Sequence, residues 1–346
     1  MPNWSSDSTP VRDAGPSRRQ FFRKAGLAAG GLYALAGPSI LRPWVSGAEA
    51  ATDKRSYIGG RFGLELDNTY CGAINQFEGG NFTADVVLEG PGTDRIRRKH
   101  LGIPRIEPIT VETGLDMGKP WYDWIARTMS GEVVRKSGAV IEMDPSFKEI
   151  GRRTFTNALI SDIEFPTLDA ASKDPGKMTV SIVPEQLQLV AGSGKQSPSS
   201  GGKKNWLVSS FRLSIQGLEA ATQRATKINA FIVKQAVNVG PPGASKFSSI
   251  APGTLDFPNL AVSVPEASSG PLYAWLDDFL VKGNNGPGKD RPGVLELLAV
   301  DQKPLASVQL AGVGIFKLST EGGSGAEKTR QAKAEIFCQK MTFTVN

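Results

Sequence analysis

The chain has 346 residues, which is more than one hydrophobic core usually organises, and this length predicts two domains. Its 39 Gly and 23 Pro favour many short strands joined by turns. The formal net charge is +6, but residues 1–50 carry six Lys and Arg against three acidic residues, so the remainder holds 34 basic against 31 acidic residues. This balance excludes nucleic-acid or membrane binding driven by bulk charge alone.

The first 50 residues are expected to be an export signal rather than a folded domain. A basic segment precedes the weakly apolar residues 25–41, and an Ala-Glu-Ala site ends at residue 50. The paired arginines and the pair of Phe resemble a twin-arginine (Tat) signal, which exports folded proteins. The residues that carry this interpretation are Ser17, Arg18, Arg19, Phe21, Phe22, Lys24, Ala48 and Ala50. We expect a mature chain without a membrane span, periplasmic or extracellular; a disordered basic tail or an uncleaved anchor helix is the alternative.

The next part of the chain reads as strands around one helix. Alternation of apolar and polar residues predicts strands at 61–67, 82–89, 107–113, 133–143, 152–165 and 177–190. Between them, Pro120 and Gly131 mark the start and the end of a helix over 120–130. Trp121, Trp124 and Ile125 fall on one face of this helix at i, i+3 and i+4, which predicts that they are core residues.

The second half repeats this order. Pro271 begins a Pro-Leu-Tyr-Ala-Trp-Leu segment 151 residues after Pro-Trp-Tyr-Asp-Trp-Ile, and Trp275, Leu276 and Phe279 share its buried face. Strands are expected at 207–216, 225–237, 255–264, 293–300, 304–318 and 331–345. The sequence therefore predicts a mainly β protein of two tandem antiparallel β-sandwich or barrel modules, each flanked by one short helix. The predicted divisions are the signal 1–50, module 51–191, a flexible linker 192–205 and module 206–346.

One dense basic cluster lies in the first half. Between Val86 and Pro104 the sequence is charged and irregular, which predicts a loop; its basic side chains are Arg95, Arg97, Arg98 and Lys99. Two interpretations stay open: a solvated loop, or an arm that pairs with acidic groups of another subunit or ring. Nucleic-acid contact is disfavoured, because no stacking aromatic residues are interleaved with the cluster.

The constellations of catalysis and metal binding are missing. His100 is the single histidine and the chain has 2 Cys, too few for the usual zinc ligand sets. A Ser-His-Asp triad would have to use this one loop residue. Residues 192–195 lack the phosphate-loop pattern, since Leu189 stands in place of the first Gly and Gln196 in place of Ser or Thr. We expect no enzyme, no cofactor, no metal and no small-molecule substrate. Cys71 and Cys338 are expected to be either a disulfide or two buried thiols.

The order of short motifs between about residues 60 and 190 resembles the tail tube protein family of contractile phages and related injection systems. These motifs are Glu78-Gly79-Gly80-Asn81, Arg97-Arg98-Lys99, Ile109-Thr110-Val111-Glu112-Thr113-Gly114, Trp121-Tyr122-Asp123-Trp124, Phe155-Thr156-Asn157-Ala158 and Asp169-Ala170-Ala171-Ser172. The second half keeps the helix and the strand order but lacks the Arg-Lys arm.

The resemblance implies a β-sandwich-like subunit, six of which close into a ring whose sheets line a bore, with rings stacking through the arm. Because this chain holds two modules, three copies would supply the six positions. We therefore expect a structural protein that assembles with itself into trimeric rings or stacked tubes. The alternative is a secreted binding scaffold that kept the fold and does not assemble.

Overall fold

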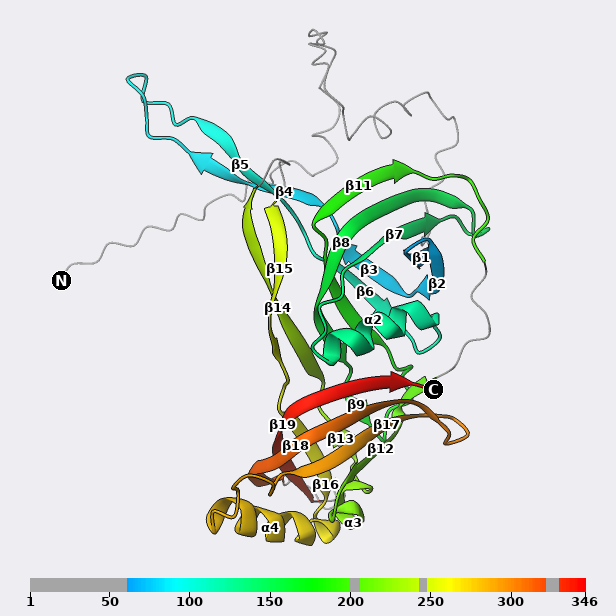
Figure 1. The fold of residues 1–346 in the computed structure, drawn as a ribbon, viewed down its shortest axis with the longest axis vertical. Coiled ribbons are helices and arrows are strands. Elements are labelled where there is room, and N and C mark those ends of the chain that lie inside the picture. The colour runs from blue at the N-terminus through cyan, green and yellow to red at the C-terminus, as the bar shows by residue number, and fades with distance from the viewer. Residues whose placement is uncertain (1–60, 199–205, 243–247, 322–329) are drawn as a thin grey trace, which may run out of the picture. The chain divides into compact units, whose positions relative to one another are not determined.

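The computed structural model describes residues 61–198, 206–242, 248–321 and 330–346. The residues of the expected export signal and residues 199–205 of the expected linker lie outside the described residues. Strands dominate the fold, and the helices are short (Figure 1). The expectation of a mainly β protein with one main helix in each half is confirmed.

The first half contains strands β1 to β11 and helix α2. Their bounds are β1 Arg61–Leu66, β2 Thr69–Ile74, β3 Gln76–Gly79, β4 Phe82–Leu88, β5 Lys99–Ile106, β6 Ile109–Thr113, α2 Lys119–Met129, β7 Lys136–Met143, β8 Glu149–Phe165, β9 Leu168–Asp169, β10 Met178–Val183 and β11 Gln186–Ala191.

The second half contains β12 to β19 with three short helical elements and a π-helical turn. Their bounds are β12 Trp206–Ile215, α3 Glu219–Thr222, β13 Lys227–Ile228, β14 Phe231–Pro242, β15 Ser248–Asp256, β16 Leu260–Pro265, η1 Glu266–Ser268, α4 Gly270–Leu276, the π-helical turn η2 Asp277–Val281, β17 Arg291–Ala299, β18 Pro304–Glu321 and β19 Gln331–Val345.

The strands form two large antiparallel sheets that share strands between the halves. The first sheet has the order β2-β1-β7-β8-β10-β6-β3, and β8 also pairs with β11 and with β14 of the second half. The second sheet has the order β12-β17-β18-β19-β16-β13-β9, so β9 of the first half lies at its edge. Each half thus completes a sheet of the other.

Strand registers and bulges recur in the two halves. In the first, β8 carries one extra residue, Ser161, opposite β10; in the second, β18 carries one extra residue, Phe316, opposite β19. The hairpin of β4 and β5 shifts register between Ala84 and Val86, and that of β14 and β15 shifts between Gln235 and Val237, each 151 residues later. Bulges depend on local sequence, so their recurrence at matching positions fixes which residues correspond.

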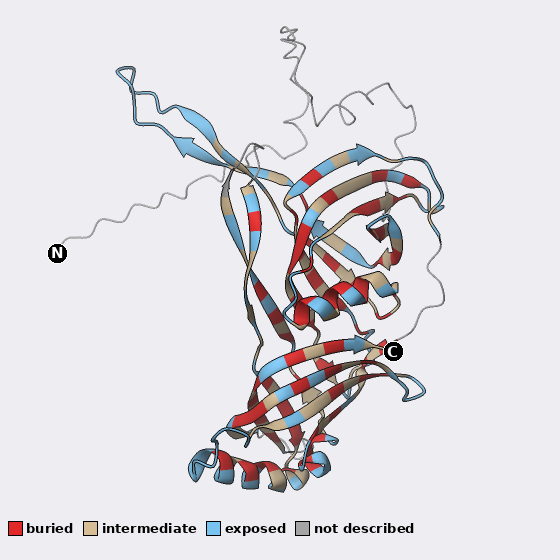
Figure 2. Cartoon of the chain, in the orientation of Figure 1, coloured by how far each residue is buried: buried red, intermediate tan, exposed pale blue. Residues whose placement is uncertain are grey.

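Both helices bury the stripe that their spacing predicts (Figure 2). α2 has Pro120 in its first turn, and Gly131 follows it with φ of 91°. α4 starts with Pro271 and continues into η2, with Gly283 after it at φ of 70°. The predicted helix-core residues Trp121, Trp124, Ile125, Trp275 and Phe279 are buried, and Leu276 is half-buried.

The loop expected between Val86 and Pro104 is wrong over much of its length. β4 continues to Leu88, and β5 begins at Lys99 and pairs with it, so only residues 89–98 form a turn. β5 contains Gly102 and Pro104, residues that are depleted in strands. Its strand form comes from the ladder with β4 rather than from intrinsic preference.

The two cysteines are free thiols and are buried. The thiol of Cys338 donates to the backbone oxygen of Lys340 at 3.0 Å. Burial raises the pKa of Cys71 to about 11, so its thiolate is scarce at neutral pH. Of the two states that the sequence left open, the structure has two buried thiols.

Candidate assembly surfaces

The basic cluster lies at the end of a two-stranded hairpin formed by β4, residues 89–98 and β5, here called the arm hairpin. β4 and β5 pair only with each other among the described residues, and the hairpin projects from the sheets (Figure 1). Its apolar side chains are exposed on both strands; they are Val86, Val87, Leu88, Leu101 and Ile103. A hairpin that is this apolar and covers nothing on its own chain is suited to contact another surface.

The charges of the arm hairpin are only partly paired. Arg98 lies 3.1 Å from Asp94, and hydrogen bonds from the Ile96 backbone N–H and from Arg98 lower the pKa of Asp94. Within the described part of the chain, Arg95 and Lys99 form no ion pair. The tip therefore offers unpaired positive charge to a partner.

The arm hairpin leaves the sheet at two glycines. Gly79 and Gly80 have φ of 78° and 63°, and a Cβ on Gly79 would lie 2.0 Å from the backbone oxygen of Pro108. Only glycine fits this approach and this conformation without strain. The Gly-Gly pair thus sets the direction in which β4 leaves β3.

The second half has a corresponding hairpin, β14 and β15, which is docked within the chain. The first residues of β14 pair with the end of β8, and the rings of Phe231 and Phe165 stack with centroids 4.7 Å apart. Farther along, the Arg135 guanidinium donates to the backbone oxygen of Ile250 on β15. This junction is the contact through which one half holds the arm-like hairpin of the other.

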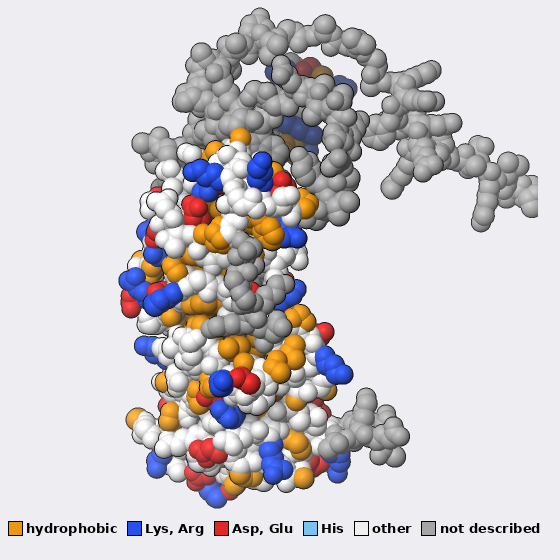
Figure 3. Space-filling view, turned by 90° about the vertical axis from the view of Figure 1, so that its right-hand side faces the viewer, with side chains coloured by type: hydrophobic (Ala, Val, Ile, Leu, Met, Phe, Trp, Pro, Cys, Tyr) orange, Lys and Arg blue, Asp and Glu red, His pale blue; other side chains and the backbone are white. Residues whose placement is uncertain are grey.

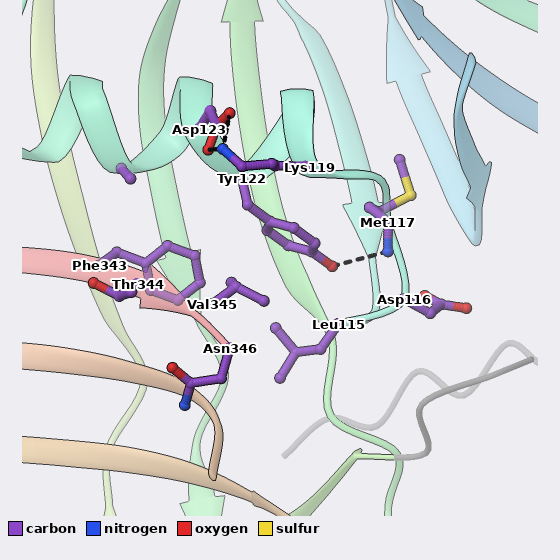
Figure 4. Close-up of a pocket in the computed structure, with 11 residues that line it drawn as sticks. Leu115, Asp116, Met117, Lys119, Tyr122, Asp123, Phe343, Thr344, Val345 and Asn346 are labelled. Carbon is purple, nitrogen blue, oxygen red and sulfur yellow. Dashed lines mark hydrogen bonds and ion pairs between the residues drawn. The ribbon is translucent and has the colours of Figure 1, made fainter. Parts of the chain in front are cut away.

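A groove of about 620 Å³ lies between α2 and the end of β19 (Figure 4). Its floor includes Leu115, Tyr122 and Phe343, while Lys119 and Asp123 form an ion pair on its rim. The Tyr122 hydroxyl accepts from the Met117 N–H at 2.9 Å and donates to the Gly114 oxygen at 3.1 Å. Burial raises the pKa of Tyr122, so this hydroxyl stays protonated and serves as a structural bridge.

No catalytic constellation gathers around the remaining candidate residues. His100 lies on the arm hairpin, 3.3 Å from Glu89 and largely exposed. Over the described ranges, no group of three or more His, Cys, Asp and Glu side chains lies close enough to hold a metal ion. Basic and acidic side chains lie next to each other on the face shown in Figure 3. Among the helices that the structure describes, none has the length and apolarity to cross a membrane.

Comparison with known proteins points to one class, the tube subunits of contractile injection machines. Residues 60–188 match the family model of the T4-like virus tail tube protein gp19. A search of curated proteins gives no significant match. The sequence-derived resemblance to tail tube proteins is thus confirmed for the first half of the chain.

Solved structures give matches that each cover less than half of this chain. A chain of the PVC sheath–tube complex from an extracellular contractile injection system is 18% identical, with a TM-score of 0.35, covering 40% of this chain and 93% of that one. A chain of the anti-feeding prophage cap is 17% identical, with a TM-score of 0.36 and 43% and 99% covered. Hcp1 from Flavobacterium johnsoniae is 11% identical, with a TM-score of 0.24 and 39% and 95% covered.

The structure separates the predicted site residues into two groups. The arm residues Arg95, Arg97, Arg98 and Lys99 come together at one hairpin end, and the helix-core residues lie in the interior. Sequence reasoning missed the stacked Phe165 and Phe231 and the junction that they mark. The signal was present in the alternating pattern at 225–237, but the pattern does not say which sheet a strand joins.

Proposed function

We propose that this chain is an exported structural protein whose two tandem tail-tube-like modules close, three chains at a time, into a pseudo-hexameric ring. The match of residues 60–188 to the tail tube family carries the proposal. The recurrence of registers and bulges supports a second module in residues 206–346. The mechanism is geometric: sheet edges that a single chain leaves open become paired when the ring closes.

Export by the twin-arginine pathway is part of the same proposal. The paired arginines, the weakly apolar run and the Ala-x-Ala site support a signal that ends at residue 50. A pathway that carries folded proteins suits a chain whose halves share strands, because sheets completed by both halves are finished before export.

The test is the mass and shape of the protein purified from the exported fraction. Light scattering should give three times the mass of one chain, which is 36.9 kDa before removal of the signal. Negative-stain microscopy should show rings with six-fold-like density, and N-terminal sequencing should start at Ala51. A stable monomer at concentrations of about 100 µM, far above the Kd of a stable interface, would overturn the proposal.

The second candidate is an exported scaffold that does not assemble. It is favoured by the difference between the two hairpins, because the cluster of Arg95, Arg97, Arg98 and Lys99 has no counterpart on β14 and β15. A ring with unlike arms would stack through only one of its two module types. A monomer that retains the same fold is the result that selects this candidate.

Reversing the charge of the arm should prevent stacking while leaving the subunit folded. The change is Glu at Arg95, Arg97, Arg98 and Lys99, all of which are exposed, so the free energy of unfolding should change by less than about 1 kcal/mol. Microscopy should then show single rings in place of tubes. The control carries Glu at four exposed lysines away from the arm: Lys282, Lys289, Lys303 and Lys340. Tubes of equal length for both variants would remove the arm from the mechanism.

A further inference from the structure

The junction between β8 and β14 is a template for a contact that one chain cannot make with itself. At this junction Phe231 lies opposite Phe165, and Lys234 lies opposite Asp162, in an antiparallel ladder. β8 is thus paired on both edges here, with β10 on the other side. The end of the first module's longest strand is completed by the hairpin root of the second.

The corresponding segment of β18 has one open edge. Matching the bulge at Ser161 to that at Phe316 places Lys317–Thr320 where β8 has Asp162–Phe165. β19 covers one edge of this segment, but the ladder with β17 ends at Val313. Along the residues that the structure describes, the other edge of Lys317–Thr320 has no strand beside it.

The strand that matches the root of β14 is the root of β4. The hairpin registers correspond at a constant spacing, since Val239 faces Ile250 as Leu88 faces Lys99. By this spacing Gly80–Thr83 takes the place of Phe231–Lys234. β4 pairs with β5 on one edge, and its other edge meets no strand of the described chain.

We propose that Gly80–Thr83 of one copy pairs antiparallel with Lys317–Thr320 of the next copy, with Thr83 opposite Lys317. The partner is a second copy of this chain, and the inference rests on the proposed ring. The new ladder repeats the internal junction with one module exchanged for the other. Repeating it head to tail closes the ring after three copies.

A second surface supports the same partner. Tyr122 of α2 packs against Phe343 of β19 with ring centroids 6.3 Å apart and is only 6% exposed. Tyr273 holds the same place on α4, yet it is 41% exposed. Phe343 faces Val308 as Leu189 faces Arg153, so Leu189 of the next copy is the residue that would cover Tyr273. The contact that buries one tyrosine inside the chain awaits the other between chains.

The two glycines at the root of β4 make this docking feasible. Gly79 and Gly80 have positive φ, whereas Ala230 and Phe231, at the matching positions, do not. Pairing in the register of β14 therefore asks the chain at these glycines to become extended. Glycine adopts both conformations at low cost, so the arm hairpin can redirect onto a neighbour.

The test is a disulfide between copies in the full exported protein. Residues directly opposite in an antiparallel ladder have Cα atoms about 4.5–5.5 Å apart, within the range of a disulfide. Thr83→Cys with Lys317→Cys should, on oxidation, give covalent dimers and trimers on non-reducing gels. Buried Cys71 and Cys338 form the same background in every variant.

Two matched pairs control the geometry. Asp162→Cys with Lys234→Cys occupies the internal junction, so it should oxidise within one chain and keep the monomer mass. Thr83→Cys with Ser319→Cys shifts the register by two residues and should crosslink at least about tenfold more slowly, since its Cα atoms would lie beyond disulfide reach.

The outcomes separate the inference from the proposed function. Trimers by light scattering together with the Thr83–Lys317 crosslink support both. Trimers without that crosslink, or with the shifted pair reacting faster, overturn the inference and leave the ring standing. A monomer in light scattering overturns the ring and the inference together.

Discussion

Trp124→Ala is expected to lower the free energy of unfolding by about 3–5 kcal/mol, the usual cost of removing a large buried aromatic side chain. Trp124 is 0% exposed, and its ring lies 6.0 Å from that of Trp121. Its indole N–H donates to the Val134 oxygen at 3.0 Å, and alanine would leave this acceptor unpaired. Denaturant unfolding followed by far-UV circular dichroism measures the effect.

The comparison variants are Trp275→Ala and Val133→Ala. Trp275 is buried at the matching place in the second half, so its loss should be of similar size. Val133 neighbours the same backbone segment but is exposed, and its change should cost less than about 1 kcal/mol. A Trp124 variant as stable as the Val133 variant would mean that α2 does not anchor the core.

Arg152→Met is the second large expected effect, about 2–3 kcal/mol of unfolding free energy. The Arg152 guanidinium joins Glu65 of β1 at 2.8 Å to Glu149 at 2.9 Å. The Glu149 side chain is only 6% exposed, and Ser193 would remain as its one side-chain donor. Removing Arg152 leaves a nearly buried carboxylate without its cation. Lys119→Met, which breaks an exposed pair with Asp123, should cost less than about 0.5 kcal/mol.

The pH dependence gives a second measurement of the Arg152 cluster. Burial acts to raise the pKa of Glu149, but hydrogen bonds from Arg152 and Ser193 outweigh it, and the pKa lies below its ordinary value of 4.5. This stabilisation is therefore present above about pH 4.5 and is lost as pH falls through the lowered pKa of the folded state. The gap in stability between the wild type and Arg152→Met should narrow on going from about pH 7 to about pH 3. A gap that is constant across this range would contradict the assignment.

The helices and most strands could be predicted from the sequence because their patterns are local. Trp121, Trp124 and Ile125 repeat at helical spacing, and Pro120 and Gly131 bound the helix chemically. β5 could not be predicted, because Gly102 and Pro104 oppose strand formation and the ladder with β4 supplies it.

The assembly surfaces were harder to predict than the fold. The basic cluster of Arg95 and its neighbours is visible in sequence because like charges are adjacent. The docking of β14 on β8 is a pairing of segments 66 residues apart, such as Phe231 with Phe165, and no local periodicity encodes the choice of partner strand. The open edge at Lys317–Thr320 is visible only once both ladders are known.

The ladder between β8 and β14 also bears on how a ring would form in dilute solution. In a ring of three such chains, every second junction lies within one polypeptide and forms during folding, at a high effective concentration that dilution does not reduce. Only the three junctions between chains depend on encounter. An exported protein, diluted outside the cytoplasm, would need three molecules to meet where a single-module subunit needs six.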